Sequence, residues 1–335
     1  MGSFISYRPL APEPKPRLPW KLLVGAVVGA LIIFVIIPSI LNRKLSTFEI
    51  ITAGPKVAGD QTDPQDLSTL YPFTREALDP QQFQLIDNPE SATLLLKTSA
   101  QSVVVADLAT GKVLYQKAGH DKLPEASLTK LFTAVTAYEN VVMDASFRVS
   151  NFAANQEPHR MGVKEGETYA LRELMYGLFL ASGNDATEVI AEGSPGARTR
   201  FIEAMNRKAE WLQLKDTRLQ NPSGLDQDQH YSSAWDIATI MRYAYRAHPE
   251  LKEIMGTRDY HFGQNEGHRE FWLTHISEFM KENGTIKAVK TGYTDTAGYC
   301  WAAIAEKDGK GIVIAFLNSW AGKEDATHLV QQFLP

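Results

Sequence analysis

Three short motifs in this chain carry the groups needed for acyl transfer through a serine ester. They occur once each, in the order Ser127–Lys130 (SLTK), Ser182–Asn184 (SGN) and Lys290–Gly292 (KTG). Together they supply a nucleophilic hydroxyl, a lysine that could act as a base, a second hydroxyl beside an amide, and a cation followed by glycine. Each motif is weak alone. All three in this order, at separations that fit one domain of ~250 residues, favour a serine acyl-transfer enzyme.

The spacing within the first motif brings a hydroxyl and an amine together. Ser127 is expected at the start of a helix, and Lys130, three residues later, then lies on the same face. The helix N-terminus would stabilise negative charge on Ser127. Burial and the second cation, Lys290, would lower the pKa of Lys130, so that its neutral amine could take the Ser127 proton. The alternative is that Ser127 only caps the helix.

The second motif follows an apolar helical stretch and contains a glycine that permits a tight turn. We expect Ser182 to relay a proton to the leaving amine. Asn184 would either hold a substrate amide or orient Lys130. Asp185 is given a structural role, because a free carboxylate in the cleft would repel an anionic substrate.

The third motif ends an apolar, strand-like stretch, residues 286–289. Lys290 and Thr291 suit a substrate carboxylate, because they offer one charge and one hydroxyl. Gly292 would let an extended ligand lie against the strand like an additional strand. The N–H of Ser127 and one N–H of this strand would form the oxyanion hole.

Longer stretches around the motifs resemble the low-molecular-mass D-alanyl-D-alanine carboxypeptidases, which are penicillin-recognising serine acyl-enzymes. The resemblance covers roughly residues 95–320. It is carried by residues 166–169 (GETY), 178–186 (LFLASGNDA), 221–225 (NPSGL), 230–234 (HYSSA) and 290–300 (KTGYTDTAGYC).

The resemblance implies that the D-Ala-D-Ala end of a peptidoglycan stem peptide acylates the serine and that water then frees it. β-Lactam antibiotics would acylate the same serine, and no cofactor would be needed. Some family members have histidine after the third motif, where this chain has Tyr293, whose backbone N–H would complete the oxyanion hole. The implied catalytic residues are Ser127, Lys130, Ser182 and Asn184, and the implied substrate-binding residues are Lys290, Thr291, Gly292 and Tyr293.

Three other functions remain open at this point: a D,D-endopeptidase, a β-lactamase, or a non-catalytic wall-binding module. A β-lactamase must deacylate fast, and the glutamate that positions water in one such class has no recognisable counterpart here. The complete set of Ser127, Lys130 and Lys290 argues against a non-catalytic module.

Composition narrows the class of protein further. The 335 residues carry a net charge of −5 and no basic block with interleaved aromatics, so nucleic-acid binding has little support. The eight histidines form no metal-binding pattern beside a carboxylate, and no metal is expected. The single cysteine, Cys300, excludes an intrachain disulfide and lies in an apolar run, which indicates a buried, inert thiol.

Residues 22–41 form 20 consecutive positions without a charge. At ~1.5 Å per residue, a helix of that length spans about 30 Å, the thickness of a bilayer core. A cleaved signal peptide is the alternative, but its apolar region is usually about 7–15 residues long. We expect a retained transmembrane anchor. The preceding residues 1–21 are proline-rich and carry four Lys or Arg, which predicts a cytoplasmic tail and a catalytic domain outside the cell membrane.

The remaining pattern predicts a stalk over residues 42–91 and an α+β catalytic domain over 92–335. Apolar and turn patterns indicate strands at both ends of this domain and helices between them. We therefore expect an antiparallel sheet flanked by helices, with a helical subdomain inserted; the resemblance implies a β-lactamase/transpeptidase-like fold. The expected strands are 93–97, 102–107, 112–116, 286–290, 299–305 and 311–316, and the expected helices begin near 128 and cover 171–179, 197–212, 236–247 and 324–333.

Overall fold

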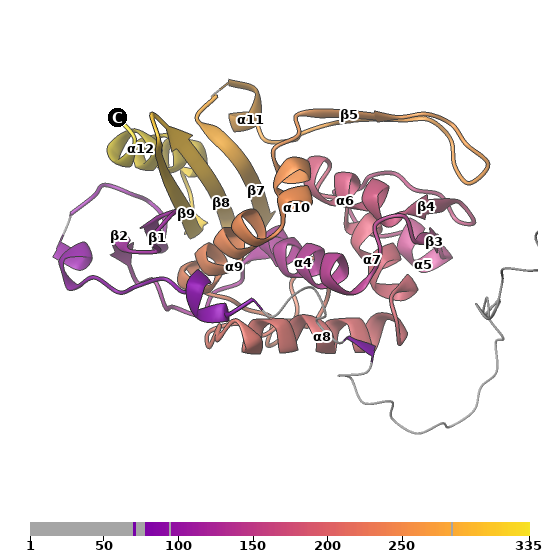
Figure 1. The fold of residues 1–335 in the computed structure, drawn as a ribbon, viewed down its shortest axis with the longest axis horizontal. Coiled ribbons are helices and arrows are strands. Elements are labelled where there is room, and N and C mark those ends of the chain that lie inside the picture. The colour runs from indigo at the N-terminus through magenta and orange to yellow at the C-terminus, as the bar shows by residue number, and fades with distance from the viewer. Residues whose placement is uncertain (1–69, 72–77, 94, 283) are drawn as a thin grey trace, which may run out of the picture. The chain divides into compact units, whose positions relative to one another are not determined.

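A five-stranded antiparallel sheet forms one side of the described domain (Figure 1). The structure is a computed structural model, and it describes residues 70–71, 78–93, 95–282 and 284–335. The strand order is β2-β1-β9-β8-β7, so strands from both ends of the domain share one sheet. The strands of this sheet are β1 (Ser102–Asp107), β2 (Val113–Lys117), β7 (Ile286–Thr294), β8 (Gly298–Lys307) and β9 (Lys310–Ser319).

The three inner strands are apolar along most of their length because both faces of the sheet are covered. On one face, side chains such as Val104 and Ala302 join the large core of the helical region, against which α9 packs. On the other face, side chains such as Val105 and Trp301 form a second core beneath α12. β7 forms one edge of the sheet, so its outer backbone groups have no strand neighbour among the described residues.

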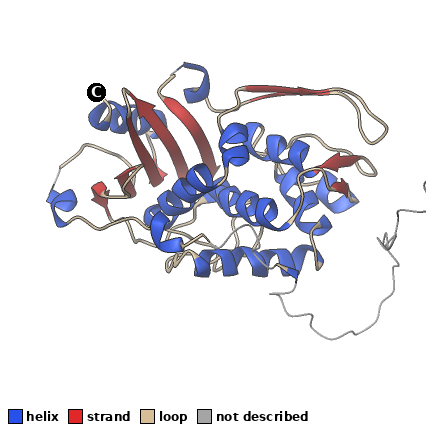
Figure 2. Cartoon of the chain, viewed as in Figure 1, coloured by secondary structure: helices blue, strands red, loops and turns tan. Residues whose placement is uncertain are grey.

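The helices between residues 130 and 255 gather on one side of the sheet, as Figure 2 shows, and α12 covers the other side. A single 3₁₀ turn, η4, leads directly into α4, which is buried along almost its whole length. The helical elements from η4 onward are η4 (Ala126–Thr129), α4 (Lys130–Asn140), α5 (Asn151–Ala154), α6 (Leu171–Leu180), α7 (Asn184–Gly193), α8 (Ala197–Trp211), α9 (Ala234–Ala247), α10 (Pro249–Met255), α11 (Phe279–Glu282) and α12 (Gly322–Phe333).

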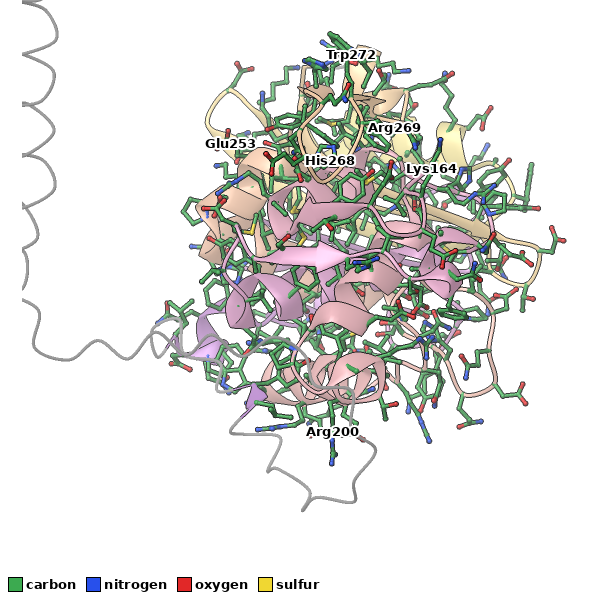
Figure 3. The ribbon with its side chains drawn as sticks, turned by 90° about the vertical axis from the view of Figure 1, so that its right-hand side faces the viewer. Lys164, Arg200, Glu253, His268, Arg269 and Trp272 are labelled. Carbon is green, nitrogen blue, oxygen red and sulfur yellow. The ribbon has the colours of Figure 1, made fainter. Side chains whose placement is uncertain are left out.

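Two small antiparallel pairs lie outside the main sheet. They are β3 (Ser146–Arg148) with β4 (Thr168–Ala170), and β5 (Asp259–Phe262) with β6 (Phe271–Thr274). The β5–β6 pair forms a long ribbon that extends beyond α10 and α6 (Figure 1). In Figure 3, Trp272 of β6 lies at one end of the domain and Arg200 of α8 at the opposite end.

The α+β architecture predicted from the sequence is confirmed, including the 102–116 hairpin and the helices near 171, 197, 236 and 324. The three C-terminal strands are longer than predicted. The predicted strand at 93–97 is wrong. The 3₁₀ turn η3 (Pro89–Thr93) occupies its start, and residues 95–97 have no regular structure. Leu95 is 95% exposed there, so this apolar residue does not belong to a buried strand.

The predicted membrane segment, 22–41, and the preceding tail lie outside the described residues, as does most of the predicted stalk. Within the part of the chain that the structure describes, no helix combines the length and apolar character needed to cross a bilayer.

Candidate active site

Ser127 lies in the 3₁₀ turn that begins the long buried helix α4. This turn packs against β7, which brings the first and third motifs together although 163 positions separate Ser127 from Lys290. The residue before the nucleophile, Ala126, is buried and adopts a left-handed backbone (φ 50°). Such strain in a non-glycine residue is typical of functional sites. It turns the chain sharply, so that Ser127 faces a cavity while its neighbours are buried.

Lys130 is fully buried and points directly at the nucleophile. Its Nζ lies 2.8 Å from Ser127 Oγ, 2.6 Å from Asn184 Oδ1 and 2.7 Å from the backbone oxygen of Ser223. A protonated lysine has three N–H donors, and three acceptors surround it here. When Lys130 is neutral, Asn184 and Ser223 can still accept two hydrogen bonds. The nitrogen lone pair is then left facing Ser127, as a base must be.

The surroundings of Lys130 favour that neutral form. Burial lowers the pKa of Lys130 well below its ordinary value, and the charge of Lys290 lowers it further. The carboxylates of Asp185 and Glu188 act in the opposite direction but are the smaller effects. The predicted lowering by burial and like charge is therefore confirmed.

Lys290 and Ser182 form the second half of the site. Lys290 Nζ donates to Ser182 Oγ at 2.7 Å and to the backbone oxygen of Thr291 at 2.7 Å. Burial lowers the pKa of Lys290 to about 7. Ser182 has a left-handed backbone (φ 52°), a second strained residue beside the cavity. Lys290 does not itself line the cavity, whereas Thr291 does, so a bound carboxylate would meet the Thr291 hydroxyl directly.

Both polar ends of the Asn184 side chain have partners in the structure. Its Oδ1 accepts from Lys130, while its Nδ2 donates to the backbone oxygen of Glu157 at 3.0 Å. Both ends of the amide are therefore occupied, which favours the orienting of Lys130 over the binding of a substrate amide. Asp185 has the structural role that was predicted. Its carboxylate accepts from the backbone N–H groups of residues 161, 162 and 163 and fixes that loop beside the second motif.

Gly292 is required by close packing between β7 and the nucleophile turn. A Cβ at this position would lie 2.9 Å from the Ser127 nitrogen and 3.0 Å from Ala126 Cβ. The glycine thus lets the edge strand approach the N–H of Ser127.

The cavity that Ser127 faces has a volume of about 530 Å³. Ser182, Thr291, Gly292 and Tyr293 line it near the nucleophile, together with His159. The cavity brings together most of the residues predicted from the sequence, while Lys130, Asn184 and Lys290 lie immediately behind its wall. Among the described residues, no group of three His, Cys, Asp or Glu side chains is placed to hold a metal ion.

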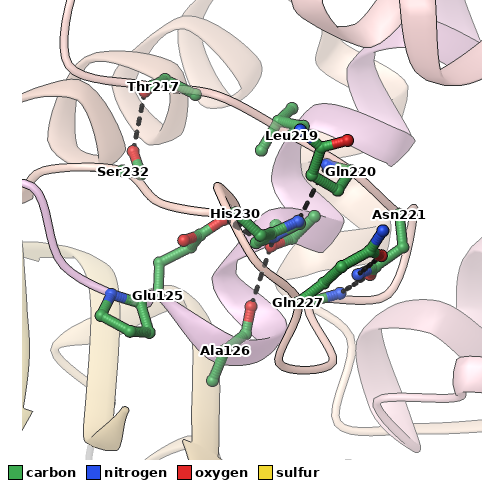
Figure 4. Close-up of polar contacts among 12 residues, drawn as sticks. Glu125, Ala126, Thr217, Leu219, Gln220, Asn221, Gln227, His230 and Ser232 are labelled. Atoms are coloured by element: carbon green, nitrogen blue, oxygen red, sulfur yellow. Dashed lines mark hydrogen bonds and ion pairs between the residues drawn. The ribbon is translucent and has the colours of Figure 1, made fainter. Parts of the chain in front are cut away.

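A buried polar network lies beside the nucleophile turn, and Figure 4 shows Glu125, Ala126, Gln220 and His230 within it. Thr129 Oγ1 donates to Glu125 Oε1 at 2.7 Å and lies 2.9 Å from His230 Nε2. His230 Nδ1 accepts from the backbone N–H of Gln220, so the imidazole links the turn to the segment before Asn221. This network holds residues 125–129 and 220–230 in a fixed relation.

Sequence reasoning did not identify three contributors to the site. The backbone oxygen of Ser223 holds Lys130, and no side-chain pattern signals such a carbonyl. Helix α7 was not predicted, because the apolar content of residues 184–193 is modest and no change of period separates it from α6. His159 lines the cavity from a loop without regular structure, and its proximity to Ser127 arises only from the fold.

A family profile described as D-alanyl-D-alanine carboxypeptidase matches residues 88–320. The carboxypeptidase DacF of Bacillus subtilis is 35% identical over 234 residues, which cover 68% of this chain and 60% of DacF. DacD of Escherichia coli is 31% identical over 241 residues, with the same coverage. The chain thus spans about 60% of the length of these two curated relatives.

Solved structures show the same likeness in three dimensions. A D-alanyl-D-alanine carboxypeptidase from Mycobacterium tuberculosis has 28% sequence identity and a TM-score of 0.66, covering 73% of this chain and 94% of its own. The Streptomyces K15 DD-transpeptidase has 25% identity and a TM-score of 0.66, with 71% and 98% coverage. The α+β domain described above is therefore the penicillin-binding, β-lactamase/transpeptidase-like fold of these enzymes.

Proposed function

This chain belongs to the D-alanyl-D-alanine carboxypeptidase family, and on that premise we propose that it is a serine D,D-carboxypeptidase acting on peptidoglycan stem peptides. Its substrate would end in D-Ala-D-Ala, and the reaction would release the terminal D-alanine. The observation that carries the proposal is the position of Lys130. Its buried amine lies 2.8 Å from Ser127 Oγ, and two further acceptors fix its orientation.

Acylation begins when neutral Lys130 takes the proton of Ser127 and Oγ attacks the carbonyl carbon of the penultimate D-alanine. The carbonyl oxygen becomes an oxyanion, which the backbone N–H groups of Ser127 and Tyr293 stabilise. The C–N bond then breaks, and the leaving amine takes a proton through Ser182. This hydroxyl is suited to the relay because Lys290 donates to its oxygen, which leaves its own proton free to point toward the cavity.

Substrate orientation follows from the edge strand β7. An extended peptide would pair with this edge, and its terminal carboxylate would reach the Thr291 hydroxyl. The positive charge of Lys290, whose Nζ contacts Ser182 Oγ beside the cavity, favours binding of that carboxylate. Deacylation reverses the proton path. Water attacks the ester carbonyl and gives up a proton to Ser182, the bond from the carbonyl carbon to Ser127 Oγ breaks, and Oγ recovers a proton from Lys130.

The direct test is release of D-alanine from diacetyl-L-Lys-D-Ala-D-Ala by the purified protein. We expect catalytic release by the wild type and its loss in Ser127→Ala. Release from neither protein would refute the proposal. The same preparations should be given benzylpenicillin. A long-lived acyl-enzyme fits a carboxypeptidase, whereas rapid turnover of the opened drug would show a β-lactamase instead. A protein that binds peptidoglycan without either reaction would be a wall-binding module.

We also propose that residues 22–41 anchor the catalytic domain in the cell membrane. The support is the run of 20 uncharged residues and the basic residues of segment 1–21, which favour a cytoplasmic N-terminus. In this arrangement residues 42–91 would be a membrane-proximal stalk and residues 92–335 an extracytoplasmic catalytic domain. Membrane fractionation with and without residues 1–41 tests the anchor. Full-length protein recovered in the soluble fraction would contradict it.

A further inference from the structure

Three aromatic side chains are exposed to solvent at one edge of the cavity that contains Ser127. They are Tyr293 of β7, Tyr299 of β8 and Trp320, which follows β9, and all three line the cavity. Tyr293 is 53% exposed, Tyr299 51% and Trp320 82%. We call these three side chains the aromatic rim. Apolar side chains that are exposed together beside a groove are typical of a binding surface.

The fold places the three side chains of the aromatic rim next to one another. Tyr293 and Tyr299 are direct cross-strand partners, and their ring centroids lie 4.8 Å apart. Tyr299 also pairs with Ser319 of β9, so Trp320 follows directly after a neighbour of Tyr299. The first residue of α12 packs closely on the same tyrosine, because a Cβ at Gly322 would lie 3.0 Å from Tyr299 Cβ. The aromatic rim is therefore held by the edge of the main sheet and the start of α12.

The direction of a bound substrate brings the residue before D-Ala-D-Ala to the aromatic rim. In the proposed reaction the terminal carboxylate meets Thr291, and the penultimate carbonyl oxygen meets the N–H of Tyr293. Followed from its C-terminus, the substrate therefore runs along β7 from Thr291 towards Thr294. At ~3.3 Å per residue in an extended chain, the next substrate residue lies beside the end of β7, where the aromatic rim is.

The two faces of the sheet differ at this end of β7. Successive side chains of a strand point to opposite faces, so Tyr293 lies on the face that α12 covers and Thr294 on the other. On that other face the Thr294 hydroxyl donates to Asp226 Oδ1 at 2.8 Å, which ties the strand to the loop that contains Asp226. The cavity that contains Ser127 extends onto the face with Tyr293. A substrate side chain in this cavity therefore has room over the aromatic rim.

Charges beside the aromatic rim favour a cationic side chain. The Tyr293 hydroxyl donates to Asp295 Oδ1 at 3.3 Å, and Glu324, in the first turn of α12, lines the cavity. Lys323 also lines the cavity, but it forms an ion pair with Glu278 at 2.8 Å. Asp295 and Glu324 form no ion pair among the described residues, so both are available to attract a cation.

The N-terminus of α12 opposes this preference only weakly. It carries a partial positive charge of about half an elementary charge, but the first turn holds two carboxylates, Glu324 and Asp325. Aromatic faces attract a cation within about 6 Å of the ring, and the same rings contact an aliphatic chain over a large apolar area. This edge of the cavity therefore fits an unbranched aliphatic chain that ends in a protonated amine.

We propose that the aromatic rim binds the side chain of the residue that precedes D-Ala-D-Ala, and that it selects an unbranched chain ending in a protonated amine. This inference rests on the proposed function and adds the class of stem peptide that the enzyme prefers. The reaction itself is unchanged, because the same ester forms on Ser127 and D-alanine is still the leaving group. Glu324 and the aromatic rim thus determine specificity and take no part in bond breaking.

Three substrates of the form Nα-acetyl-L-X-D-Ala-D-Ala test this proposal, with X as lysine, norleucine or 2-aminoadipate. All three side chains are unbranched and aliphatic, and they end in an amine, a methyl group and a carboxylate. For the wild type we expect kcat/KM for D-alanine release to be about three- to tenfold higher with lysine than with norleucine, and lowest with aminoadipate. Equal kcat/KM for the lysine and norleucine substrates would overturn the proposal.

Substitutions at the edge of the cavity test which side chains produce this preference. Trp320→Leu removes a ring but keeps an apolar side chain, and Glu324→Gln removes a charge but nearly keeps the shape. Each should reduce the lysine-to-norleucine ratio about twofold, and the double variant should reduce it to about one. Because this readout is a ratio within one preparation, partial misfolding cancels.

Trp272→Leu is the matched control. Trp272 is 74% exposed, like the residues of the aromatic rim, but it lies on β6 and does not line the cavity. Its substitution should leave the lysine-to-norleucine ratio unchanged. A wild-type ratio in the double variant of Trp320 and Glu324 would overturn the proposal.

Failure of the proposed function and failure of this inference give different results. If none of the three substrates releases D-alanine, the carboxypeptidase function fails. If all three release D-alanine but the lysine substrate is not preferred, the function stands and the role of the aromatic rim is refuted.

Discussion

Gly224 offers a sharp test of how the nucleophile turn is held in place. It has φ +86°, and a Cβ there would lie 1.9 Å from the backbone oxygen of Ala126, 2.4 Å from its carbonyl carbon and 2.8 Å from Thr129 Oγ1. These atoms directly flank Ser127. Gly224→Ala must therefore displace the turn that carries the nucleophile, in addition to straining its own backbone.

The expected loss of folding stability in Gly224→Ala can be set against a matched control, Gly309→Ala. Gly309 also has positive φ (+77°), but a Cβ there would meet nothing within 4 Å. Its substitution should cost only the left-handed backbone penalty, about 1–2 kcal/mol. Gly224→Ala carries the same penalty plus an overpacking cost of about 1–3 kcal/mol, so we expect a total loss of roughly 2–5 kcal/mol.

Urea unfolding measures the two stabilities, and labelled penicillin measures the acylation rate of the folded protein. Since misplacing a reacting group by about 1 Å can cost 10²-fold in rate, we expect Gly224→Ala to acylate at least tenfold more slowly. Gly309→Ala should acylate at the wild-type rate. The reasoning is refuted if the two variants have equal stability and both acylate like the wild type.

Four further outcomes are expected. Lys130→Met should slow acylation by labelled penicillin by about 10²–10⁴-fold, the range for loss of a general base, and a wild-type rate would exclude Lys130 from that role. Lys290→Met should raise the pKa of Lys130, because a repelling charge is removed; acylation, which increases with pH as Lys130 loses its proton, should then do so at higher pH, and an unmoved profile would contradict the coupling. Burial opposes ionisation of Glu139, but hydrogen bonds from His248 and other partners outweigh burial and lower the pKa of Glu139. The stabilising effect of the Glu139 carboxylate is therefore present at neutral pH and lost as pH falls through that lowered pKa. Glu139→Gln should cost about 3–5 kcal/mol in urea unfolding at neutral pH and less in acid, and an equal loss at both pH values would contradict this linkage. Burial raises the pKa of Cys300 to about 12, so iodoacetamide at mildly alkaline pH should label it only in urea; labelling of the native protein would show an accessible thiol.

The sequence was most informative where a functional group needs a specific side chain. Ser127, Lys130 and Lys290 were identified from type and order alone, and the structure brings them to one place. The lowered pKa of Lys130 could also be predicted from the sequence, because burial and a nearby second lysine both disfavour the charged form of a lysine.

Backbone atoms and long-range packing could not be predicted in the same way. The oxygen of Ser223 holds Lys130, yet any residue has such an oxygen. The strand expected at 93–97 failed because a short apolar run does not show whether a neighbouring strand or helix will cover it. The pairing of Thr291 with Trp301 depends on a register that only the folded sheet reveals.

The central claim is that Ser127 forms an acyl-enzyme with Lys130 as its base. Mass spectrometry of the intact protein and of its peptides after brief exposure to benzylpenicillin tests it most directly. We predict that the protein gains the mass of one whole drug molecule, located on the peptide that contains Ser127, and that Ser127→Ala gains none. An adduct on another residue, or an equal adduct in Ser127→Ala, would contradict the claim.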